Sequence, residues 1–293
     1  QSFLIQILWL MNLLLTLFII LTIIYYASSF RKYNSRRKSF SLFNNNELNR
    51  LPAEIEAKTI MNKPDGFGSL STLSRKNKVF HFPQSTIVGF SVDENGKPFF
   101  VLSTLSMHTR NLLLNNSASL CVTEYGFQNV GDSRVTLTGK INKVKSENKI
   151  DFFKKKYLLD HPYADWINYG DFSVYHMCSI LDINYVGGFR RAGPINIPKY
   201  IHSLPDNMIF NMTSNMKKLE DNYLDSIKNY CKTSYPSIFS EEKLRTINVK
   251  NFDSQGINIK YIDNNNKILL RLPFKKKIKN FNELIEKIDK DLF

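Results

Sequence analysis

The pattern of hydrophobic and polar positions changes three times along the 293 residues of the chain. Residues 3–26 form an uncharged run in which Leu, Ile and Phe dominate. From about residue 62, short apolar stretches alternate with turn residues, a pattern typical of β-strands. After a proline-rich stretch at 192–205, apolar residues recur every three or four positions over 207–232, which predicts an amphipathic helix. The pattern therefore predicts a leader, a β-rich domain and a smaller mixed domain.

The β-rich part is predicted to contain seven strands and two helices. The strands are expected at 68–75, 84–93, 97–103, 118–125, 133–145, 172–182 and 184–189. Asn95-Gly96, between the second and third strands, is a preferred two-residue hairpin turn because both residues tolerate a positive φ. Helices are expected at about 106–115 and 147–159. Six or seven strands with helices at two connections predict a small closed or split β-barrel.

The last part of the chain is predicted to be a small α+β domain. Its strands are expected at 245–252, 257–263 and 267–274, and a final helix begins at Asn280, which forms a capping box with Glu283. The predicted fold class is thus mainly β, a split barrel followed by an α+β domain, with an N-terminal hydrophobic helix. The predicted boundaries are 1–30 for a signal peptide or transmembrane anchor, 31–61 for a basic Ser/Asn-rich transit-like segment and linker, 62–192 for the barrel, 193–205 for a second linker and 206–293 for the α+β domain.

The leader admits three interpretations. Residues 3–26 are long enough to cross a bilayer, which needs about 20 apolar residues, so they would suit a membrane anchor. A buried helix is disfavoured because the run has no amphipathic face. Small residues at 27–29 would instead suit cleavage of a signal peptide, and the basic, acid-free segment 30–46 has the composition of a transit peptide. We therefore expect a plastid location reached by the secretory route, with a membrane anchor and a basic juxtamembrane linker as the alternative.

Charge sharpens the interpretation of the leader and excludes one partner class. The formal net charge is +14, but five positive charges lie within residues 31–38 and no acid precedes Glu47. These charges concern routing and membrane topology. The rest of the chain has no nucleic-acid-binding signature, so nucleic acid is not an expected partner. Three scattered cysteines are too few for a disulfide framework or a structural zinc site.

Polar residues at two strand ends could converge on an anionic ligand. Binding of a phosphate or carboxylate needs hydroxyls, backbone donors and a cation at one place, and antiparallel strands could bring these groups to one rim of the barrel. Arg134, at the start of the long fifth strand, could join this cluster. The cofactor-binding candidates of this kind are Arg75, Ser103, Thr104, Ser106, His108, Arg110 and Arg134. We predict no catalytic residue and no metal ligand, because the chain has no Cys–His pair at metal-ligand spacing and no GxGxxG, P-loop or GxSxG motif.

Five strings occur in an order and spacing that resemble one superfamily. They are GFGSLSTLSRKN (66–77), FFVLSTLSMHTRNLLLNNSASLCV (99–122), SRVTLTGKINKV (133–144), LDHPYADWINYGDFSVYHM (159–177) and YVGGFRRAGPI (185–195). Together they resemble the split-barrel, FMN-binding superfamily of pyridoxamine 5′-phosphate oxidase-like proteins. The similarity is to the branch that holds haem-utilisation oxygenases and the plastid glutamyl-tRNA-reductase-binding protein. The tail, with LRTINVKNFDSQGINIKY and LLRLPFKKKI, resembles the small C-terminal domain of many members.

The resemblance implies two candidate cofactors, FMN and haem, and is also compatible with none. In flavin-binding members a Ser-Arg-Lys string after the third strand holds the FMN phosphate. The matching place here reads Ser106-Met107-His108, which lacks both cations, although Arg75 or Arg110 could compensate. Haem requires an axial ligand, usually His, and cations for its propionates.

Several residues bear on the haem alternative. Arg190 and Arg191 are candidate partners for the propionates, and His176, within a strand, is expected to be packed or hydrogen-bonded. Related C-terminal domains often carry two His in a His-Met-Asn-Glu-x-His string. The corresponding residues 218–223 contain no His, which disfavours a haem-degrading oxygenase of that type.

The resemblance implies, as the leading function, a non-catalytic binding or regulatory protein that contacts a protein partner. It would be similar to the plastid glutamyl-tRNA-reductase-binding protein and linked to tetrapyrrole or haem handling. The alternatives are an FMN-dependent oxidoreductase, a haem-degrading oxygenase and a membrane-tethered barrel with a structural role, held through residues 3–26 if the leader is uncleaved. Because split-barrel relatives pair around their ligand site, the resemblance also implies a homodimer.

Overall fold

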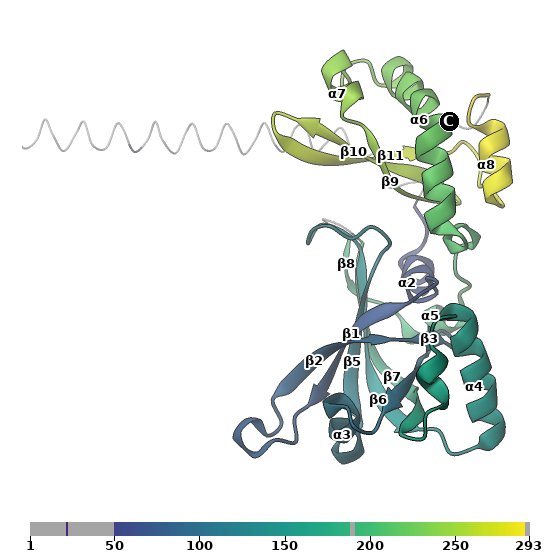
Figure 1. The fold of residues 1–293 in the computed structure, drawn as a ribbon. Helices are drawn as coiled ribbons and strands as arrows, with labels where there is room; N and C mark the ends of the chain where they lie inside the picture. Colours follow the sequence, from purple (N-terminus) through teal and green to yellow (C-terminus); the bar gives the residue numbers. More distant parts are fainter. Residues whose placement is uncertain (1–21, 23–49, 188–190, 291–293) are drawn as a thin grey trace, which may run out of the picture. The chain divides into compact units, whose positions relative to one another are not determined.

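The computed structural model describes residue 22 and residues 50–187 and 191–290 (Figure 1). The chain divides into two units, Gln1–Leu48 and Asn49–Phe293, and every element discussed below belongs to the second unit. Apart from residue 22, the predicted hydrophobic helix, with the signal peptide or anchor at 1–30, lies outside the described residues, as does most of the transit-like segment. Within the described ranges, no helix has both the length and the apolar character needed to cross a membrane.

One antiparallel sheet of eight strands forms the larger part of this unit (Figure 1). Its strands are β1 (Phe67–Leu73), β2 (Pro83–Gly89), β3 (Ser91–Val92), β4 (Pro98–Ser103), β5 (Ser117–Thr123), β6 (Arg134–Lys143), β7 (Phe172–Val186) and β8 (Ala192–Pro194). The strand order is β2-β1-β5-β6-β7-β4-β3, and β8 pairs with β7. Every second residue is buried along β1 and β5 and through most of β6, as expected of strands with one face on a core.

A single bent segment brings the two ends of this sheet together. β2 pairs with β1 at one end of the strand order, whereas β3 pairs with β4 at the other end. Only Phe90 separates β2 from β3, and its backbone N–H donates to the carbonyl oxygen of Gly66 at 2.9 Å. Because one segment supplies both end strands, the sheet curls into the predicted barrel.

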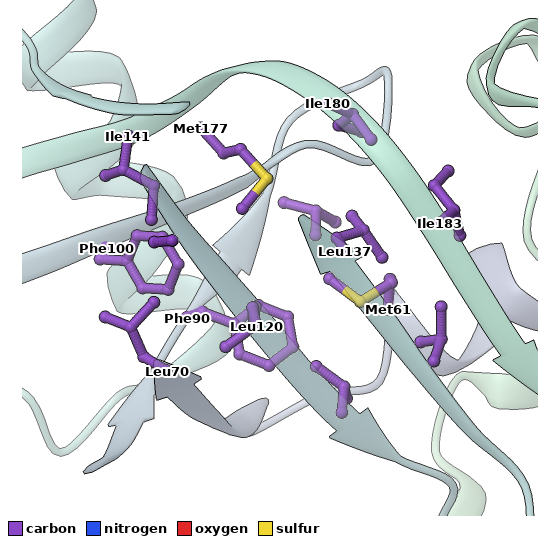
Figure 2. Packing of buried hydrophobic residues seen from close by; sticks show 14 of the residues in the cluster. Met61, Leu70, Phe90, Phe100, Leu120, Leu137, Ile141, Met177, Ile180 and Ile183 are labelled. Carbon is purple, nitrogen blue, oxygen red and sulfur yellow. The ribbon is translucent and has the colours of Figure 1, made fainter. Parts of the chain in front are cut away.

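Apolar side chains from five strands fill the barrel (Figure 2). Leu70, Phe100, Leu120, Leu137 and Met177 have no exposed surface. Burying a side chain of this size contributes roughly 1.5–3 kcal/mol. The barrel interior is therefore the core that holds the strands in register, and it works as a scaffold for residues at its rims and outer face.

Helices cover the barrel at several places. They are α2 (Ala53–Met61), α3 (Met107–Leu114), α4 (Glu147–Asp160) and α5 (Ile197–His202), with 3₁₀ turns η2 (Asn77–Val79) and η3 (Asp165–Asn168). Helix α3 lies against β1 and β2, whereas α4 lies against β3, β4 and β7. The rings of Phe153 on α4 and Phe99 on β4 pack with their centroids 4.4 Å apart. The helices predicted at 106–115 and 147–159 are confirmed.

The C-terminal part contains a second, three-stranded antiparallel sheet with the order β11-β10-β9. Its elements are η4 (Asn207–Ile209), α6 (Met212–Ser234), α7 (Glu241–Arg245), β9 (Asn248–Asp253), β10 (Gly256–Asp263), β11 (Asn266–Pro273) and α8 (Phe281–Lys287). The predicted amphipathic helix and the three predicted strands correspond to α6 and to this sheet. At the start of α8, the Asn280 side chain accepts a hydrogen bond from the Glu283 backbone N–H at 3.0 Å, which is the predicted cap.

Two of the differences between the structure and the sequence prediction concern β7 and the stretch after it. One strand, β7, replaces the two predicted at 172–182 and 184–189, and register shifts in its pairing with β6 allow it to bend without ending. The stretch interpreted as a linker at 193–205 contains most of β8 and all of α5. Pro198 lies in the first turn of α5, where its missing N–H has no helical partner to lose.

Lys250 on β9 joins the C-terminal sheet to the loop between β5 and β6. Its Nζ lies 2.5 Å from Oδ1 of Asp132 and also pairs with the carboxylate of Glu124. All three side chains are buried or nearly so. Backbone N–H groups complete the arrangement, because Gln128 donates to Asp132 at 2.7 Å and Ser133 donates to Glu124 at 3.0 Å.

Candidate functional site

The predicted cluster forms where β4 ends and α3 begins. Ser103, the last residue of β4, accepts hydrogen bonds from the Leu105 N–H at its Oγ and from the Ser106 N–H at its carbonyl oxygen, both at 3.1 Å. Its own hydroxyl donates to the carboxylate of Asp171. The Thr104 N–H donates to the Asp171 carbonyl oxygen at 2.9 Å. Asp171 therefore fixes the shape of the turn that presents Thr104 and Ser106.

His108 and Arg110 lie in the first turn of α3. His108 is half-buried, and this burial lowers the pKa of its imidazole below the ordinary value. The imidazole is therefore neutral at neutral pH, which is the form that binds metal ions. Arg110 is exposed; its Nε donates to the Thr104 carbonyl oxygen at 3.3 Å, and it makes no ion pair with any described residue.

Buried Asn111 attaches the end of β1 to this helix. Its Nδ2 donates to Oγ1 of Thr72 at 3.0 Å and to Oε1 of Gln84 at 3.3 Å. Its Oδ1 accepts from the backbone N–H of Arg75 at 3.1 Å. The backbone of Arg75, an exposed residue, thus lies beside α3, the helix that carries His108 and Arg110.

Arg134 lies away from this cluster. Arg134 begins β6 and pairs with Thr123, the last residue of β5. The other end of β5, which follows α3, begins at Ser117, and its partner on β6 is Lys140. Six residues along a strand correspond to about 20 Å. The Arg134 guanidinium donates to the carbonyl oxygen of Val130 at 2.8 Å. The expectation that Arg134 joins the cluster is therefore not met, because register rather than strand order decides which strand end a residue occupies.

Arg191 also lies away from the His108 cluster and binds residues at and just before α2. Its guanidinium donates to Oε1 of Glu56 at 3.0 Å and to the carbonyl oxygen of Leu51 at 2.6 Å. Burial raises the pKa of Glu56, although the nearby arginines oppose that shift. Arg191 therefore anchors α2 to the barrel, and Arg190 lies outside the described residues.

Two of the remaining histidines are buried or half-buried and have hydrogen-bonded ring nitrogens. His161 is fully buried; its Nδ1 lies 3.1 Å from the Tyr163 hydroxyl and its Nε2 lies 2.9 Å from the Phe90 carbonyl oxygen. Nε2 of His176 lies 3.0 Å from Oδ2 of Asp93, which confirms the prediction of a hydrogen-bonded histidine. His161 therefore has no nitrogen left for a ligand.

The other two histidines are exposed. Nδ1 of His202 lies 2.7 Å from the Pro198 carbonyl oxygen, and His81 stacks on Phe80 with ring centroids 3.9 Å apart. His108, by contrast, combines partial burial with ring nitrogens that have no hydrogen-bond partner in the described part of the chain. Its imidazole is therefore the best placed to bind a ligand within the predicted cluster.

Sequence reasoning did not assign the two residues that organise this cluster. Asn111 lies on α3 between Arg110 and Leu112, and nothing in this local sequence indicates that its side chain is buried. Asp171 immediately precedes the long strand β7. Both act on residues far away in the sequence, so their function depends on the folded register.

The sheet closes on itself, apolar side chains fill its interior, and helices connect several of its strands. These features define a split-barrel protein of the pyridoxamine 5′-phosphate oxidase-like class. The sequence match is more specific: residues 50–202, more than half of the chain, match the family model described as CREG, beta-barrel. The chain belongs to this family. The predicted superfamily is thereby confirmed.

Individual relatives extend the comparison beyond the barrel. The Non-canonical heme oxygenase HOZ, chloroplastic, of Arabidopsis thaliana is 28% identical over 264 residues, which cover 85% of this chain and 76% of the relative. A solved structure titled heme binding protein from Mycobacterium smegmatis has a TM-score of 0.56 at 21% identity and covers 82% of this chain and 95% of that chain. A protein of unknown function from Agrobacterium tumefaciens has a TM-score of 0.45 at 16% identity, with 82% and 98% covered. The Mycobacterium structure shows that the fold is shared.

Proposed function

We propose that this protein binds haem at the surface formed by the β4–α3 turn, the first turn of α3 and the end of β1. The observation that carries the proposal is His108, a half-buried neutral imidazole without a hydrogen-bond partner among the described residues. Arg75 and Arg110 supply two exposed guanidinium groups that no described acid neutralises. One imidazole and two cations are the groups that an iron and two propionates require.

The surroundings of His108 also suit a flat, partly apolar ligand. Leu105, beside the turn, is 70% exposed, and Leu113 on α3 is 63% exposed. Apolar side chains next to a ligand-binding histidine cover the macrocycle and exclude water from the iron. The bound haem would supply the iron centre. The protein would hold it with the His108 imidazole, orient it with the arginines and keep the turn rigid through Asp171.

Two further observations favour haem over FMN. The relative with 28% identity is named a heme oxygenase, and its match extends over most of the chain. At the position of the Ser-Arg-Lys string of flavin-binding members, the first turn of α3 reads Ser106-Met107-His108. An imidazole replaces a permanent cation there, which weakens a phosphate site and creates a candidate iron ligand. FMN binding stays an untested prediction.

The test is a titration of the full chain with hemin, followed at the Soret band. We expect a saturable shift of the band in the unmodified protein. His108→Ala should remove the shift, whereas His202→Ala, which alters an exposed histidine outside the cluster, should leave it unchanged. The absence of a shift in the unmodified protein would overturn haem binding, and an unchanged shift in His108→Ala would overturn this site.

A matched pair of variants tests the cations. Arg75→Gln combined with Arg110→Gln should weaken hemin binding about tenfold or more, since hydrogen bonds to charged groups contribute about 1.5–3 kcal/mol. Arg245→Gln combined with Lys275→Gln removes the same charge at two exposed positions of the C-terminal part and should not alter the affinity. Equal effects of the two changes would indicate nonspecific attraction of the propionates by net charge.

The name of the same relative favours haem degradation as a second candidate function. The experiment adds ascorbate in air to the haem-loaded full chain and follows the Soret band with time. Bleaching that is lost in His108→Ala would support an oxygenase. A stable Soret band would instead support a non-catalytic haem-binding or regulatory protein.

We further propose that two copies pair through the outer face of β1, β5 and β6. The central part of this face carries short, half-exposed side chains: Ser69, Ser71, Ser119, Cys121, Thr136 and Thr138. They align across the strands in two rows, so a second flat surface could approach closely. Light scattering after size exclusion should give twice the 34.1 kDa of one chain. Ser119→Arg should give the monomer, and Ser237→Arg, at an exposed site elsewhere, should not.

We also propose a plastid location, supported by the composition of the leader and by the chloroplastic relative. Residues 1–50 fused to a fluorescent reporter should direct it to the plastid. Retention of the reporter in a cell membrane would support the alternative of an anchored protein.

A further inference from the structure

A cavity of about 590 Å³ lies between the first turns of α4 and the ends of β6 and β7. Its lining includes Lys143, Lys149, Phe152 and His176, none of which belongs to the His108 cluster. Cavities that bind small molecules in proteins have volumes of about 300–1,000 Å³ and combine apolar walls with a few fixed polar groups. This cavity has both kinds of lining.

The fixed polar group is His176, which Asp93 holds in place. The Asp93 carboxylate is nearly buried and accepts hydrogen bonds from the backbone N–H groups of Asn95 at 2.9 Å and Lys97 at 2.8 Å. Burial alone would raise the pKa of Asp93, but these bonds and the one from His176 hold it below its usual range. An ionised carboxylate only accepts, so Nε2 of His176 carries the proton of their 3.0 Å hydrogen bond.

The second ring nitrogen of His176 is consequently available. Nδ1 has no hydrogen-bond partner among the described residues, and the imidazole lines the cavity. Because Asp93 fixes the ring orientation through Nε2, Nδ1 is held at one defined position.

Three lysines supply positive charge at the same cavity. Lys143 ends β6, Lys145 follows it, and Lys149 lies in the first turn of α4. All three are exposed, and none forms an ion pair within residues 50–187 and 191–290. The lining also includes the exposed acid Glu94, and Asp93 is already satisfied by its hydrogen bonds. The excess of unpaired ammonium groups favours an anionic ligand.

An exposed aromatic ring forms the apolar wall. Phe152 on α4 is 54% exposed, although a phenylalanine at this position gains nothing from contact with water. The ring of the next residue, Phe153, is buried; its centroid lies 5.7 Å from that of Phe152 and 5.2 Å from that of the His176 imidazole. A flat ligand ring placed against Phe152 would cover apolar surface and lie at the same cavity as His176.

We propose that this cavity binds a small aromatic molecule that carries a phosphate group. The ammonium groups of Lys143, Lys145 and Lys149 bind the phosphate, Phe152 packs against the aromatic ring, and Nδ1 of His176 accepts a hydrogen bond from a polar group on that ring. The proposal is independent of haem binding at His108, because the two sites share no residue.

Binding of methylumbelliferyl phosphate to the full chain, measured by fluorescence anisotropy, tests this proposal. The probe should bind, and methylumbelliferone, which lacks the phosphate, should bind much more weakly. Lys145→Gln combined with Lys149→Gln should weaken binding of the probe about tenfold or more. Lys155→Gln combined with Lys275→Gln removes the same charge at exposed positions outside the cavity and should have little effect.

A second pair of variants tests the apolar wall and guards against loss of folding. Phe152→Ser should weaken binding of the probe, whereas Leu159→Ser, at an 83% exposed position on the same helix, should not. Circular dichroism confirms that each variant is folded. Failure of the unmodified protein to bind the probe, or equal binding by cavity and control variants, would overturn the proposal. Hemin titration should be unchanged at saturating probe; displacement of one ligand by the other would instead place both at one site.

Discussion

Replacing Lys250 with methionine removes the cation that two buried carboxylates share. Its side chain is 4% exposed, and those of Asp132 and Glu124 are 3% and 11% exposed. Removal of one partner of a buried ion pair typically costs about 3–5 kcal/mol, because the remaining charge is uncompensated. Some compensation remains here: Lys260 lies 3.9 Å from Asp132, and Asn251 donates to Glu124 at 3.0 Å. We therefore expect a loss of about 3 kcal/mol in the free energy of unfolding.

Urea denaturation of the full chain, followed by circular dichroism, measures this loss. Lys232→Met is the matched control, because Lys232 and its partner Glu241 are both largely exposed and their ion pair is screened by water. The reasoning would be refuted if the two substitutions changed the unfolding free energy equally. An intermediate in the Lys250→Met transition, with the two sheets unfolding separately, would agree with a role in joining them.

The acid side of the stability profile gives an independent check on the same cluster. Burial opposes ionisation of Asp132, but the hydrogen bonds from Lys250 and from the backbone prevail and hold its pKa below the usual value. A carboxyl group with a lowered pKa contributes stability above its unfolded pKa, and this contribution is lost as the pH falls. The unmodified protein should therefore lose stability more steeply below about pH 4 than Lys250→Met does.

Three further substitutions test other parts of the structure. Burial lowers the pKa of Lys58 to about 8, whereas its ordinary pKa is 10.5. Between these values the unfolded chain binds more protons than the folded chain, so the free energy of unfolding should rise with pH. Lys58→Met should remove about 2 kcal/mol of this rise between pH 8 and 10, and pH–stability profiles that run parallel in the variant and the unmodified protein would contradict the argument. Gly139→Ala would direct a Cβ into the carbonyl oxygen of Ser179 on the neighbouring strand, so it should lower the thermal midpoint of unfolding by several degrees. An unchanged midpoint would count against this close approach of β6 and β7. Asn111→Ala leaves the backbone N–H of Arg75 and two polar side chains without a partner. It should lower the free energy of unfolding, measured by urea denaturation, by about 2–3 kcal/mol and also weaken hemin binding. Normal hemin affinity in this variant would show that Asn111 does not support the haem site.

Strands with one buried face were predictable from the sequence. In β5 and β6, buried and half-exposed residues alternate along the strand, so a period of two is visible in the letters alone. In β7 the alternation breaks where the strand bends, which explains why one strand was predicted as two. Helix α5 was hidden by its prolines, because Pro in a first helical turn looks the same in sequence as Pro in a linker.

The cluster near His108 was only partly predictable. The residues from Ser103 to Arg110 are neighbours in sequence, so their proximity needed no knowledge of the fold. Asn111 and Asp171 act across 36 and 68 residues, a relation set by packing and register. Arg134 was wrongly expected in the cluster, because its position depends on which end of β6 lies near α3, and the sequence does not show this.

The bend at Phe90 has a consequence for how two copies of this chain can meet. In an open sheet, the end strands present rows of free N–H and C=O groups, which invite edge-to-edge growth into extended assemblies. Here β2 and β3 are the end strands, and the single residue between them brings both ends to the same place. Lateral addition of strands at either end is thereby hindered, and face-to-face contact is favoured. The bend therefore works against growth into a fibre, and it is compatible with the proposed pairing of two copies through a sheet face.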